Sequence, residues 1–182
     1  CQGFGMDCNP ELIAAAQNNT AKLGFSDRFV LHTGELADTR FLENLRMEAS
    51  PVQLVMANPP WRLVGSGRLP ATEARRKALF GDKGTFPLFA SAASSLLEED
   101  GRFACIISPD RLQDMLAALD GAGLTPYLLQ YIHKQKTSPA TFVLIEARKG
   151  AHAKPSVAEP IALYGQERFF TLESLAFCPF LR

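Results

Sequence analysis

The sequence lacks the residue patterns that identify several common classes of protein. It has no CxxC pair and no Cys/His spacing typical of a metal site, and His32, His133 and His152 lie far apart, so we predict no metal. It has no net charge, because 19 basic residues balance 19 acidic ones, which counts against a dedicated nucleic-acid binder with a global positive field. No apolar run approaches the about 20 residues that span a bilayer, and the first residues do not resemble a signal peptide. We therefore expect a soluble, cytoplasmic protein with free, mostly buried thiols.

The residues that are present suit a globular α/β domain. Of the 182 residues, 47% are hydrophobic and 21% are charged, which is enough to bury one sizeable core. Apolar strand-like runs alternate with amphipathic segments over residues 1–150, which predicts an open α/β sheet covered by helices. Residues 151–182 are expected to be a linker and a C-terminal tail that packs on the same domain. The expected strands are 3–7, 28–32, 53–57, 103–108 and an antiparallel edge pair at 127–133 and 141–147, and the expected helices are 10–23, 39–48, 86–99 and 110–119.

Two local signals mark the ends of expected elements. Asn9 is a good helix N-cap, a proline suits the first helical position, and Glu11 complements the positive end of the helix. Gly24 then supplies the C-terminal stop of the same helix. The pair Pro59-Pro60 cannot continue a central strand, so the chain is predicted to leave the sheet at that point.

Polar side chains stand where three of the expected strands end. Ligands of open α/β sheets bind outside the carboxyl ends of the strands, so Asp7, Glu35 and Asn58 are candidate binding residues. Asp7 has the position of an acid that accepts hydrogen bonds from a ribose diol, and Glu35 or its neighbouring backbone amide could meet an adenine edge. Asp38 is a weaker candidate of the same kind. Each of these acids is also compatible with an ordinary solvated loop position.

The run Asn58-Pro59-Pro60-Trp61 is the most specific motif in the chain. An amino group conjugated to a ring or carbonyl is a poor nucleophile, because its lone pair is delocalised. If the Asn58 side-chain oxygen and the Pro59 carbonyl accept its two N–H hydrogens, the lone pair is aimed at an electrophilic methyl group and the developing charge meets preplaced dipoles. Trp61 would stack on the flat substrate. The alternative is that the prolines only terminate a strand and Trp61 fills the core.

The segment after this motif is expected to be an irregular loop with a short helix, and it is rich in cations. Such a patch could hold phosphates, although a merely solvated loop is compatible with the same residues. The cations are Arg62, Arg68, Arg75, Arg76, Lys77 and Lys83.

At this point the chain resembles the class I S-adenosylmethionine-dependent methyltransferases with an Asn-Pro-Pro-aromatic motif. The resemblance covers roughly residues 3–147 and is most similar to the bacterial valine-tRNA adenine-N6 methyltransferase family, including an Asp-Arg-Leu helix start at 110–112. It rests on Gly-x-Asp7 with Asn9-Pro10, Gly34-Glu35, the run Val55 to Trp61, Gly101-Arg102-Phe103 and Ser108 to Arg111.

The resemblance implies a Rossmann-like sheet with an antiparallel C-terminal edge and S-adenosylmethionine as cofactor. By the same resemblance, Asp7 and Cys8 lie at the ribose of the cofactor, and Glu35 and Leu36 lie at its adenine edge. Residues 58–61 would bind the target amine of an RNA, with tRNA favoured, and Asn58 would also contact the cofactor.

Two departures from the family leave alternatives open. Trp61 replaces the usual Tyr or Phe, and the first strand with its glycine-rich cofactor loop is absent from the sequence as given. The motif equally suits a protein-glutamine methyltransferase of release-factor type or a guanine-N2 methyltransferase of ribosomal RNA. A non-catalytic remnant that binds RNA would explain the absent loop but not the intact motif.

Overall fold

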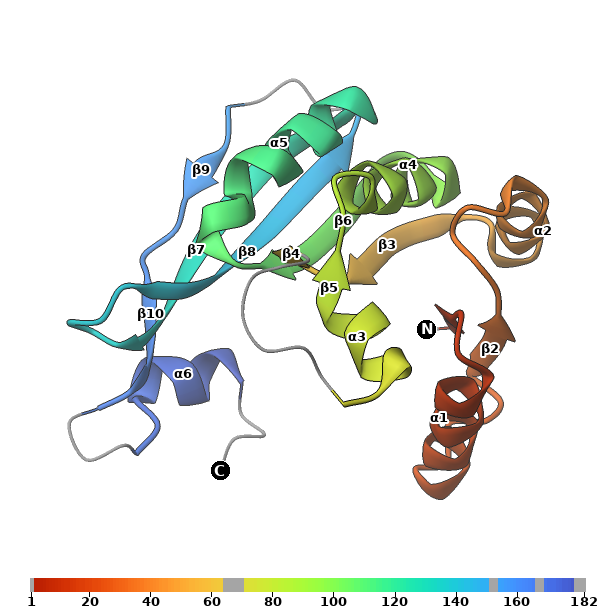
Figure 1. Ribbon diagram of the computed structural model, residues 1–182, viewed down its shortest axis with the longest axis horizontal. Helices are drawn as coiled ribbons and strands as arrows, with labels where there is room; N and C mark the ends of the chain where they lie inside the picture. The colour runs from red at the N-terminus through yellow and green to blue at the C-terminus, as the bar shows by residue number, and fades with distance from the viewer. Residues whose placement is uncertain (1, 64–70, 151–153, 166–168, 179–182) are drawn as a thin grey trace. The chain divides into compact units, whose positions relative to one another are not determined.

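The structure is a computed structural model of the 182-residue chain, and it describes residues 2–63, 71–150, 154–165 and 169–178. The chain divides into two compact units, Cys1–Pro51 and Val52–Arg182. Figure 1 draws the helices and strands of both units. Within the described ranges, no helix combines the length and the apolar character needed to cross a membrane.

The first unit is a β-α-β-α segment built on two parallel strands. Strand β1 (Gly3–Asp7) pairs in parallel with β2 (Phe29–Thr33) along its whole length. Helix α1 (Pro10–Lys22) connects the two strands, and α2 (Thr39–Ala49) follows the second strand. The predicted alternation of strand and helix is confirmed in this unit.

Side-chain caps explain where both helices of the first unit begin. The Asn9 side-chain oxygen accepts a hydrogen bond from the backbone N–H of Glu11 at 2.9 Å, as the sequence predicts. Gly24, with φ of 72°, follows the end of α1 in the left-handed conformation that glycine adopts without strain. Asp38 caps α2, because its carboxylate accepts from the N–H of Phe41 at 3.1 Å.

The second unit is built on a six-stranded mixed sheet (Figure 1). Its strands are β3 (Val52–Ala57), β6 (Leu97–Ile107), β7 (Leu124–Gln135), β8 (Ala140–Lys149), β9 (Ser156–Val157) and β10 (Ile161–Tyr164). The order across the sheet is β10-β7-β8-β6-β3, and β9 also pairs with β7. Strand β8 runs antiparallel to β6 and β7, whereas β3 is parallel to β6 and both β9 and β10 are parallel to β7.

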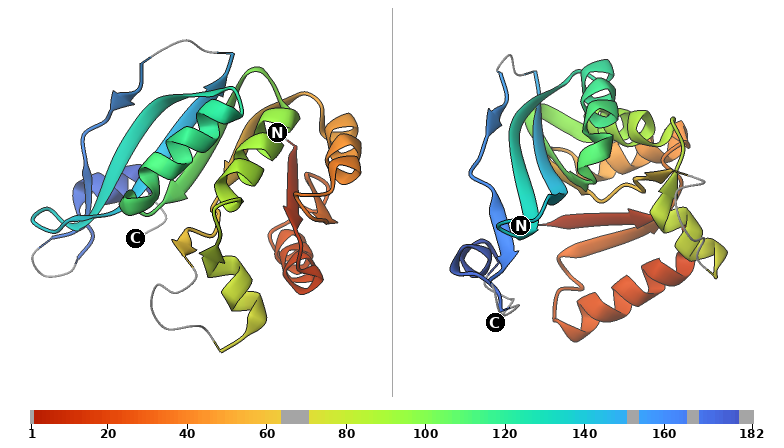
Figure 2. Two further views of the ribbon diagram at one scale, coloured as in Figure 1. Left: turned by 45° about the horizontal axis from the view of Figure 1, so that its top comes forward. Right: turned by 60° about the vertical axis from the view of Figure 1, so that its left-hand side comes forward.

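Two helices cover one face of this sheet. Helix α4 (Thr85–Leu96) and helix α5 (Leu112–Gly121) lie side by side on that face (Figure 2). A single 3-10 turn, η1 (Pro109–Arg111), leads from β6 into α5.

Short elements follow the proline pair at 59–60 and the end of the sheet. Strand β4 (Arg62–Leu63) pairs in parallel with β5 (Phe80–Gly81), and α3 (Glu73–Leu79) precedes β5. The predicted short helix in this segment is thereby confirmed. Helix α6 (Leu172–Phe177) packs against β10 near the end of the chain.

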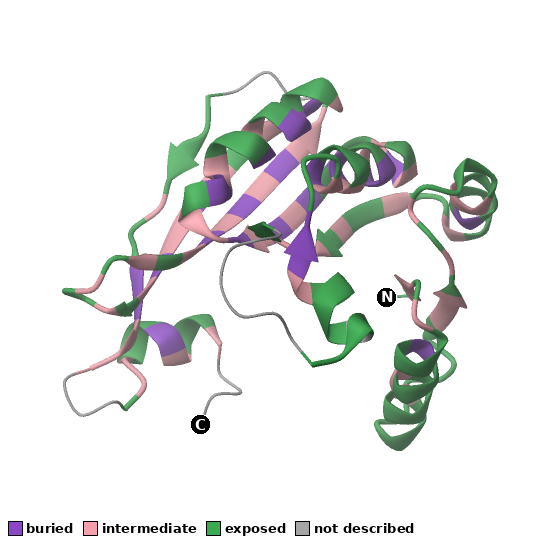
Figure 3. Ribbon diagram, viewed as in Figure 1, coloured by how far each residue is buried: buried purple, intermediate pink, exposed green. Residues whose placement is uncertain are grey.

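The core of the second unit lies between the sheet and helices α4 and α5. Phe86 of α4, Phe103 of β6, Met115 and Leu119 of α5 and Val143 of β8 are essentially inaccessible to solvent. Buried positions alternate along the strands in Figure 3, because successive side chains of a strand point to opposite faces.

The described cysteines are free thiols in three different environments. Cys8 is exposed, Cys178 is half-buried, and Cys105 is buried in the core of the second unit. Burial raises the pKa of the Cys105 thiol from 9.0 to about 12. These thiols are free as predicted, but the expectation that most of them are buried is wrong, because only Cys105 is buried.

Two expectations about the second unit are wrong in detail. The helix expected at 86–99 ends at Leu96, because Leu97 already pairs with Val52 in the sheet, and the strand then continues through a turn at Asp100, whose φ is 62°. The antiparallel pair β7-β8 is confirmed but does not form the edge, because β9 and β10 add to the far side of β7. Both additions come from residues 151–182, where the sequence predicted only a linker and a tail.

Candidate functional site

The loop of residues 58–61 leaves the sheet where the sequence predicts. Strand β3 ends at Ala57, and the four following residues take no part in a strand. Asn58 is exposed, whereas Pro59 is among the most completely buried residues of the chain. The loop therefore presents its amide side chain to solvent while the next residue anchors it in the protein.

Trp61 contacts the core and a cation at the same time. The indole packs against the core of the second unit, and its ring and the Phe142 ring form a T-shaped pair with the centroids 6.3 Å apart and an interplanar angle of 72°. The Arg62 guanidinium lies over the indole, 5.4 Å from the ring centroid. A flat substrate that stacks on Trp61 would share the ring with this guanidinium or displace it.

The backbone of the same loop is held at two consecutive carbonyl groups. Arg111 donates a hydrogen bond from Nη1 to the Trp61 carbonyl oxygen at 2.8 Å. A Cβ atom at Gly81 would lie 2.6 Å from the carbonyl oxygen of Pro60, so β5 passes too close to the loop for any side chain at that position. Sequence reasoning gave neither Arg111 nor Gly81 a role. The Asp-Arg-Leu run at 110–112 marked the place of the arginine but not its partner, which lies 50 residues away.

Asp7 lies at the carboxyl end of β1 in the first unit. Its side chain is half-buried, and Oδ1 accepts a hydrogen bond from the backbone N–H of Asn9 at 2.8 Å. The Asp7 carbonyl accepts from the N–H of Gly34 at 3.1 Å, which ties the ends of β1 and β2 together. Cys8, the next residue, is exposed.

The loop after β2 carries the other predicted residues of the first unit. Glu35 is exposed and Leu36 is half-buried. A Cβ at Gly34 would lie 2.4 Å from the Phe41 ring, so a side chain at this position would require the ring to move. The Glu35 carbonyl accepts from the N–H of Asp38 at 3.0 Å, and the Asp38 carboxylate is used as a helix cap.

The predicted residues thus form two groups, one in each unit. Asp7 and the loop of 34–36 lie together at the carboxyl ends of β1 and β2. Residues 58–61 lie together at the carboxyl end of β3 in the second unit. In the described ranges, no group of three or more His, Cys, Asp or Glu residues is arranged to hold a metal ion.

Most cations of the segment after Trp61 are exposed. Arg76 forms an ion pair with Glu73 at 2.7 Å, and this hydrogen bond lowers the pKa of the Glu73 carboxyl. Arg68 lies outside the described residues. The exposed cations of the segment are Arg62, Arg75, Arg76, Lys77 and Lys83.

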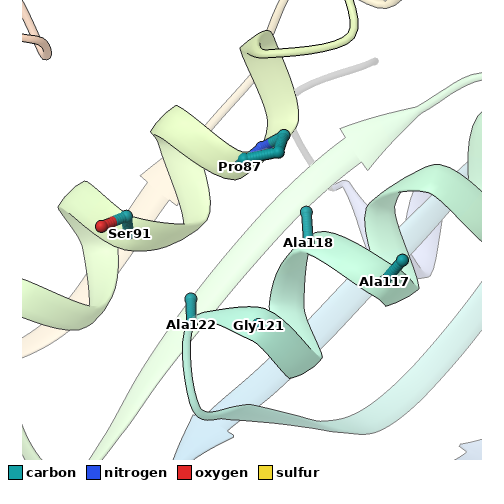
Figure 4. A pocket seen from close by; sticks show the side chains of 6 residues that line it. All are labelled: Pro87, Ser91, Ala117, Ala118, Gly121 and Ala122. Carbon is teal, nitrogen blue, oxygen red and sulfur yellow. The ribbon is translucent and has the colours of Figure 1, made fainter.

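A hollow of about 250 Å³ lies between α4 and α5 (Figure 4), and its lining residues are distant in sequence from the 58–61 loop. Its walls are small and mostly apolar side chains, and it contains none of the predicted site residues. It is lined by Pro87, Ser91, Ala117, Ala118, Gly121 and Ala122.

The fold is that of the Rossmann-like methyltransferases. A predicted O-methyltransferase from Agrobacterium tumefaciens superposes with a TM-score of 0.70 at 19% identity, covering 98% of this chain and 75% of that one. A proposed methyltransferase of Streptococcus mutans, solved in complex with SAH, gives a TM-score of 0.50 at 16% identity over 80% of this chain and 76% of that one. These likenesses confirm the predicted fold class.

In sequence, the chain is similar to a more specific group. The tRNA1(Val) (adenine(37)-N6)-methyltransferase of two strains of Porphyromonas gingivalis is 33% identical over 113 residues, which is 61% of this chain and 42% of the relative. The chain therefore spans about two fifths of the length of these curated relatives. No protein-family model matches the chain. The resemblance stated from the motifs is confirmed by these relatives.

Proposed function

We propose that the protein is an S-adenosylmethionine-dependent N-methyltransferase that modifies the exocyclic N6 of an adenine in RNA, with tRNA the favoured substrate. The observation that carries the proposal is the 58–61 loop, which exposes Asn58 beside a buried Pro59 at the end of β3. Its chemistry agrees with the activity of the Porphyromonas gingivalis relatives, which are adenine-N6 methyltransferases.

The residues of the first unit fit the ribose of such a cofactor. Asp7 is half-buried at a strand end, and the hydrogen bond from the Asn9 N–H to Oδ1 orients the carboxylate without using all of its acceptor capacity. A carboxylate of this kind accepts hydrogen bonds from ribose hydroxyl groups. Glu35, or the backbone N–H of Leu36, would contact the adenine edge, and Cys8 would lie beside the ribose.

The residues of the second unit fit a planar amine. The Asn58 side-chain oxygen and the Pro59 carbonyl each accept one N–H of the target, which leaves the nitrogen lone pair free to attack. When bound, S-adenosylmethionine supplies a methyl group on a positively charged sulfur. As the nitrogen–carbon bond formed and the carbon–sulfur bond broke, with its electron pair left on the sulfur, the two oxygens would stabilise the positive charge developing on the nitrogen. The extra proton then leaves to water, so no strong base is required in the loop.

The surroundings of the loop favour RNA over a protein amide as substrate. Arg62 lies over the Trp61 ring, so a base that stacks there meets a cation able to bind its phosphate or to stack with it. Exposed cations of α3, Arg75 and Lys77 among them, lie in the same segment. Neither feature has an obvious use in binding a glutamine side chain, although an amide nitrogen would fit the loop itself.

The test uses the protein expressed from its complete reading frame with labelled S-adenosylmethionine. Separate pools of tRNA, ribosomal RNA and release factor are offered as substrates, and nucleosides or peptides are analysed after digestion. Label recovered from tRNA as N6-methyladenine, and lost in Asn58→Ala, is the expected result. Label in release factor or in ribosomal guanine would replace the proposal by the corresponding alternative. If neither cofactor binding nor methyl transfer is detected, the proposal would be replaced by the alternative of a non-catalytic remnant that binds RNA.

A further inference from the structure

Arg111 is a charged side chain in the interior of the second unit. Only 5% of its surface is exposed, and among the residues that the structure describes, Ser174 is the one other polar or charged residue that is buried. Burying a guanidinium costs several kcal/mol unless hydrogen bonds and an opposite charge offset the lost hydration. The contacts of this side chain therefore show which interactions offset the cost of its burial.

The guanidinium joins three separate segments of the second unit. Nη1 donates to the Trp61 carbonyl oxygen at 2.8 Å, and Nε donates to the Asp114 carboxylate of α5 at 2.7 Å. The central carbon lies over the ring of the fully buried Phe86, 4.5 Å from its centroid. A guanidinium is planar and its donors have fixed directions, so the carboxylate and the ring together determine where Nη1 points. The direction of the hydrogen bond to Trp61 is thus set by α4 and α5.

The partner of that hydrogen bond is the backbone of the candidate loop. The Trp61 carbonyl is three residues after Asn58, and the intervening prolines have their φ angles fixed by their rings. The Pro60 carbonyl is confined as well, because the backbone of β5 at Gly81 approaches it closely. Because the loop is this stiff, a displacement of Trp61 also displaces the Asn58 and Pro59 oxygens at its beginning.

We infer that Arg111 is a positioning residue, which acts through the Trp61 carbonyl to fix the orientation of the Asn58 and Pro59 oxygens that hold the target amine. The inference rests on the proposed function for its effect on rate, but the geometry of the loop can be measured without any reaction. Arg111 itself touches neither substrate nor cofactor in this scheme.

The test compares Arg111→Met with a matched control at a second stacked arginine. Arg148 of β8 lies over the Tyr127 ring, 3.7 Å from its centroid, and Arg148→Met removes a similar cation–aromatic contact that does not involve the loop. Arg111→Lys retains a charge but loses the fork of donors, and Asp114→Asn weakens the orienting ion pair at a residue whose side chain is 61% exposed. Because Asp114 lies at the surface, this variant is suitable even if Arg111→Met fails to fold.

Two readouts separate positioning from a merely structural role. The first is kcat and the KM for cofactor, and the expected result for Arg111→Met is a fall in kcat of about 100-fold with little change in KM. The second is the fluorine resonance of 5-fluorotryptophan at position 61, assigned as the signal that Trp61→Phe removes. It should shift in the Arg111 variants and by a smaller amount in Asp114→Asn, and it should not move in Arg148→Met.

A folded Arg111→Met or Asp114→Asn with an unchanged resonance overturns the inference, as does a fall in kcat that matches only the loss of folded protein. If the wild type methylates none of the offered substrates, the proposed function fails while the resonance still decides whether Arg111 holds the loop. A shifted resonance with wild-type kcat also overturns the inference, because the loop position would then not matter for transfer.

Discussion

The Asn58→Ala substitution tests whether an exposed side chain with no place in the core controls the reaction. Asn58 is exposed, so its truncation should change the free energy of unfolding by no more than about 0.5 kcal/mol. The amide oxygen is one of two acceptors for the target amine, and removal of one such preplaced dipole costs about 2.7–4 kcal/mol in the transition state. We therefore expect kcat to fall by a factor on the order of 100 to 1,000 while the urea unfolding curve stays in place.

The matched variant is Asn58→Asp, which keeps an acceptor oxygen at the same position and loses only the amide N–H groups. It should retain kcat within about tenfold of the wild type, because the chemistry requires an acceptor and not a donor. The exposed Asn18→Ala on α1 controls for a general effect of truncation. If Asn58→Asp and Asn58→Ala lose the same activity, or if Asn58→Ala keeps it, the assignment of the oxygen as acceptor is wrong.

Three further predictions concern the cofactor, the loop and the core. Asp7→Asn should raise the dissociation constant for S-adenosylmethionine by roughly tenfold or more, since a hydrogen bond to a charged group contributes about 1.5–3 kcal/mol, and calorimetry with an unchanged constant would contradict this. Gly81→Ala places a Cβ 2.6 Å from the Pro60 carbonyl, so it should destabilise the protein by about 1–3 kcal/mol and lower kcat, as urea unfolding and initial rates would measure. The pKa of the Cys105 thiol is raised from 9.0 to about 12, so as pH rises the unfolded chain loses the thiol proton before the folded protein does. The contribution of this thiol to the free energy of unfolding is therefore fully present below pH 9 and declines as pH rises toward 12. From pH 8 to pH 10 the wild type should lose about 1.4 kcal/mol more stability than Cys105→Ala, and equal losses would show that the thiol is not protected.

Local chemistry explains which parts of the fold could be predicted from the sequence. The start of α1 follows from Asn9 and the proline after it, and the end of β3 follows from the proline pair at 59–60. In both places the deciding interactions lie within a few residues. The strand pairing of β10 with β7 depends instead on residues about 30 positions apart, such as Ile161 with Ile132, and no local pattern carries that information.

The predicted position of the boundary between α4 and β6 was wrong for a related reason. Apolar residues continue through Leu96 and Leu97 without a break, so the sequence gives no sign that the helix has ended. Pairing of Leu97 with Val52 converts the last part of the expected helix into strand. The motif led us to propose Asn58 as a site residue, whereas no local pattern pointed to Arg111, because its hydrogen-bond partner is a carbonyl 50 residues away.

The roles proposed for Asn58 as an acceptor and for Arg111 as a positioning residue lead to a prediction about the double variant. If Arg111 acts only by positioning the Asn58 and Pro59 oxygens, the part of its contribution to kcat that depends on the Asn58 oxygen disappears once that oxygen is gone, and only the part through the Pro59 carbonyl remains. The effects of Asn58→Ala and Arg111→Met should then be non-additive, with the double variant no more than about tenfold slower than Asn58→Ala alone. Effects that multiply would mean that Arg111 serves the reaction through a different group, most directly the Trp61 ring and the base that stacks on it.

The same double-variant cycle measured on the free energy of unfolding should be additive, because Asn58 is exposed and Arg111 is buried among Phe86, Asp114 and the Trp61 carbonyl. Coupling in rate without coupling in stability is the pattern that distinguishes a positioning residue from a residue that only supports the fold.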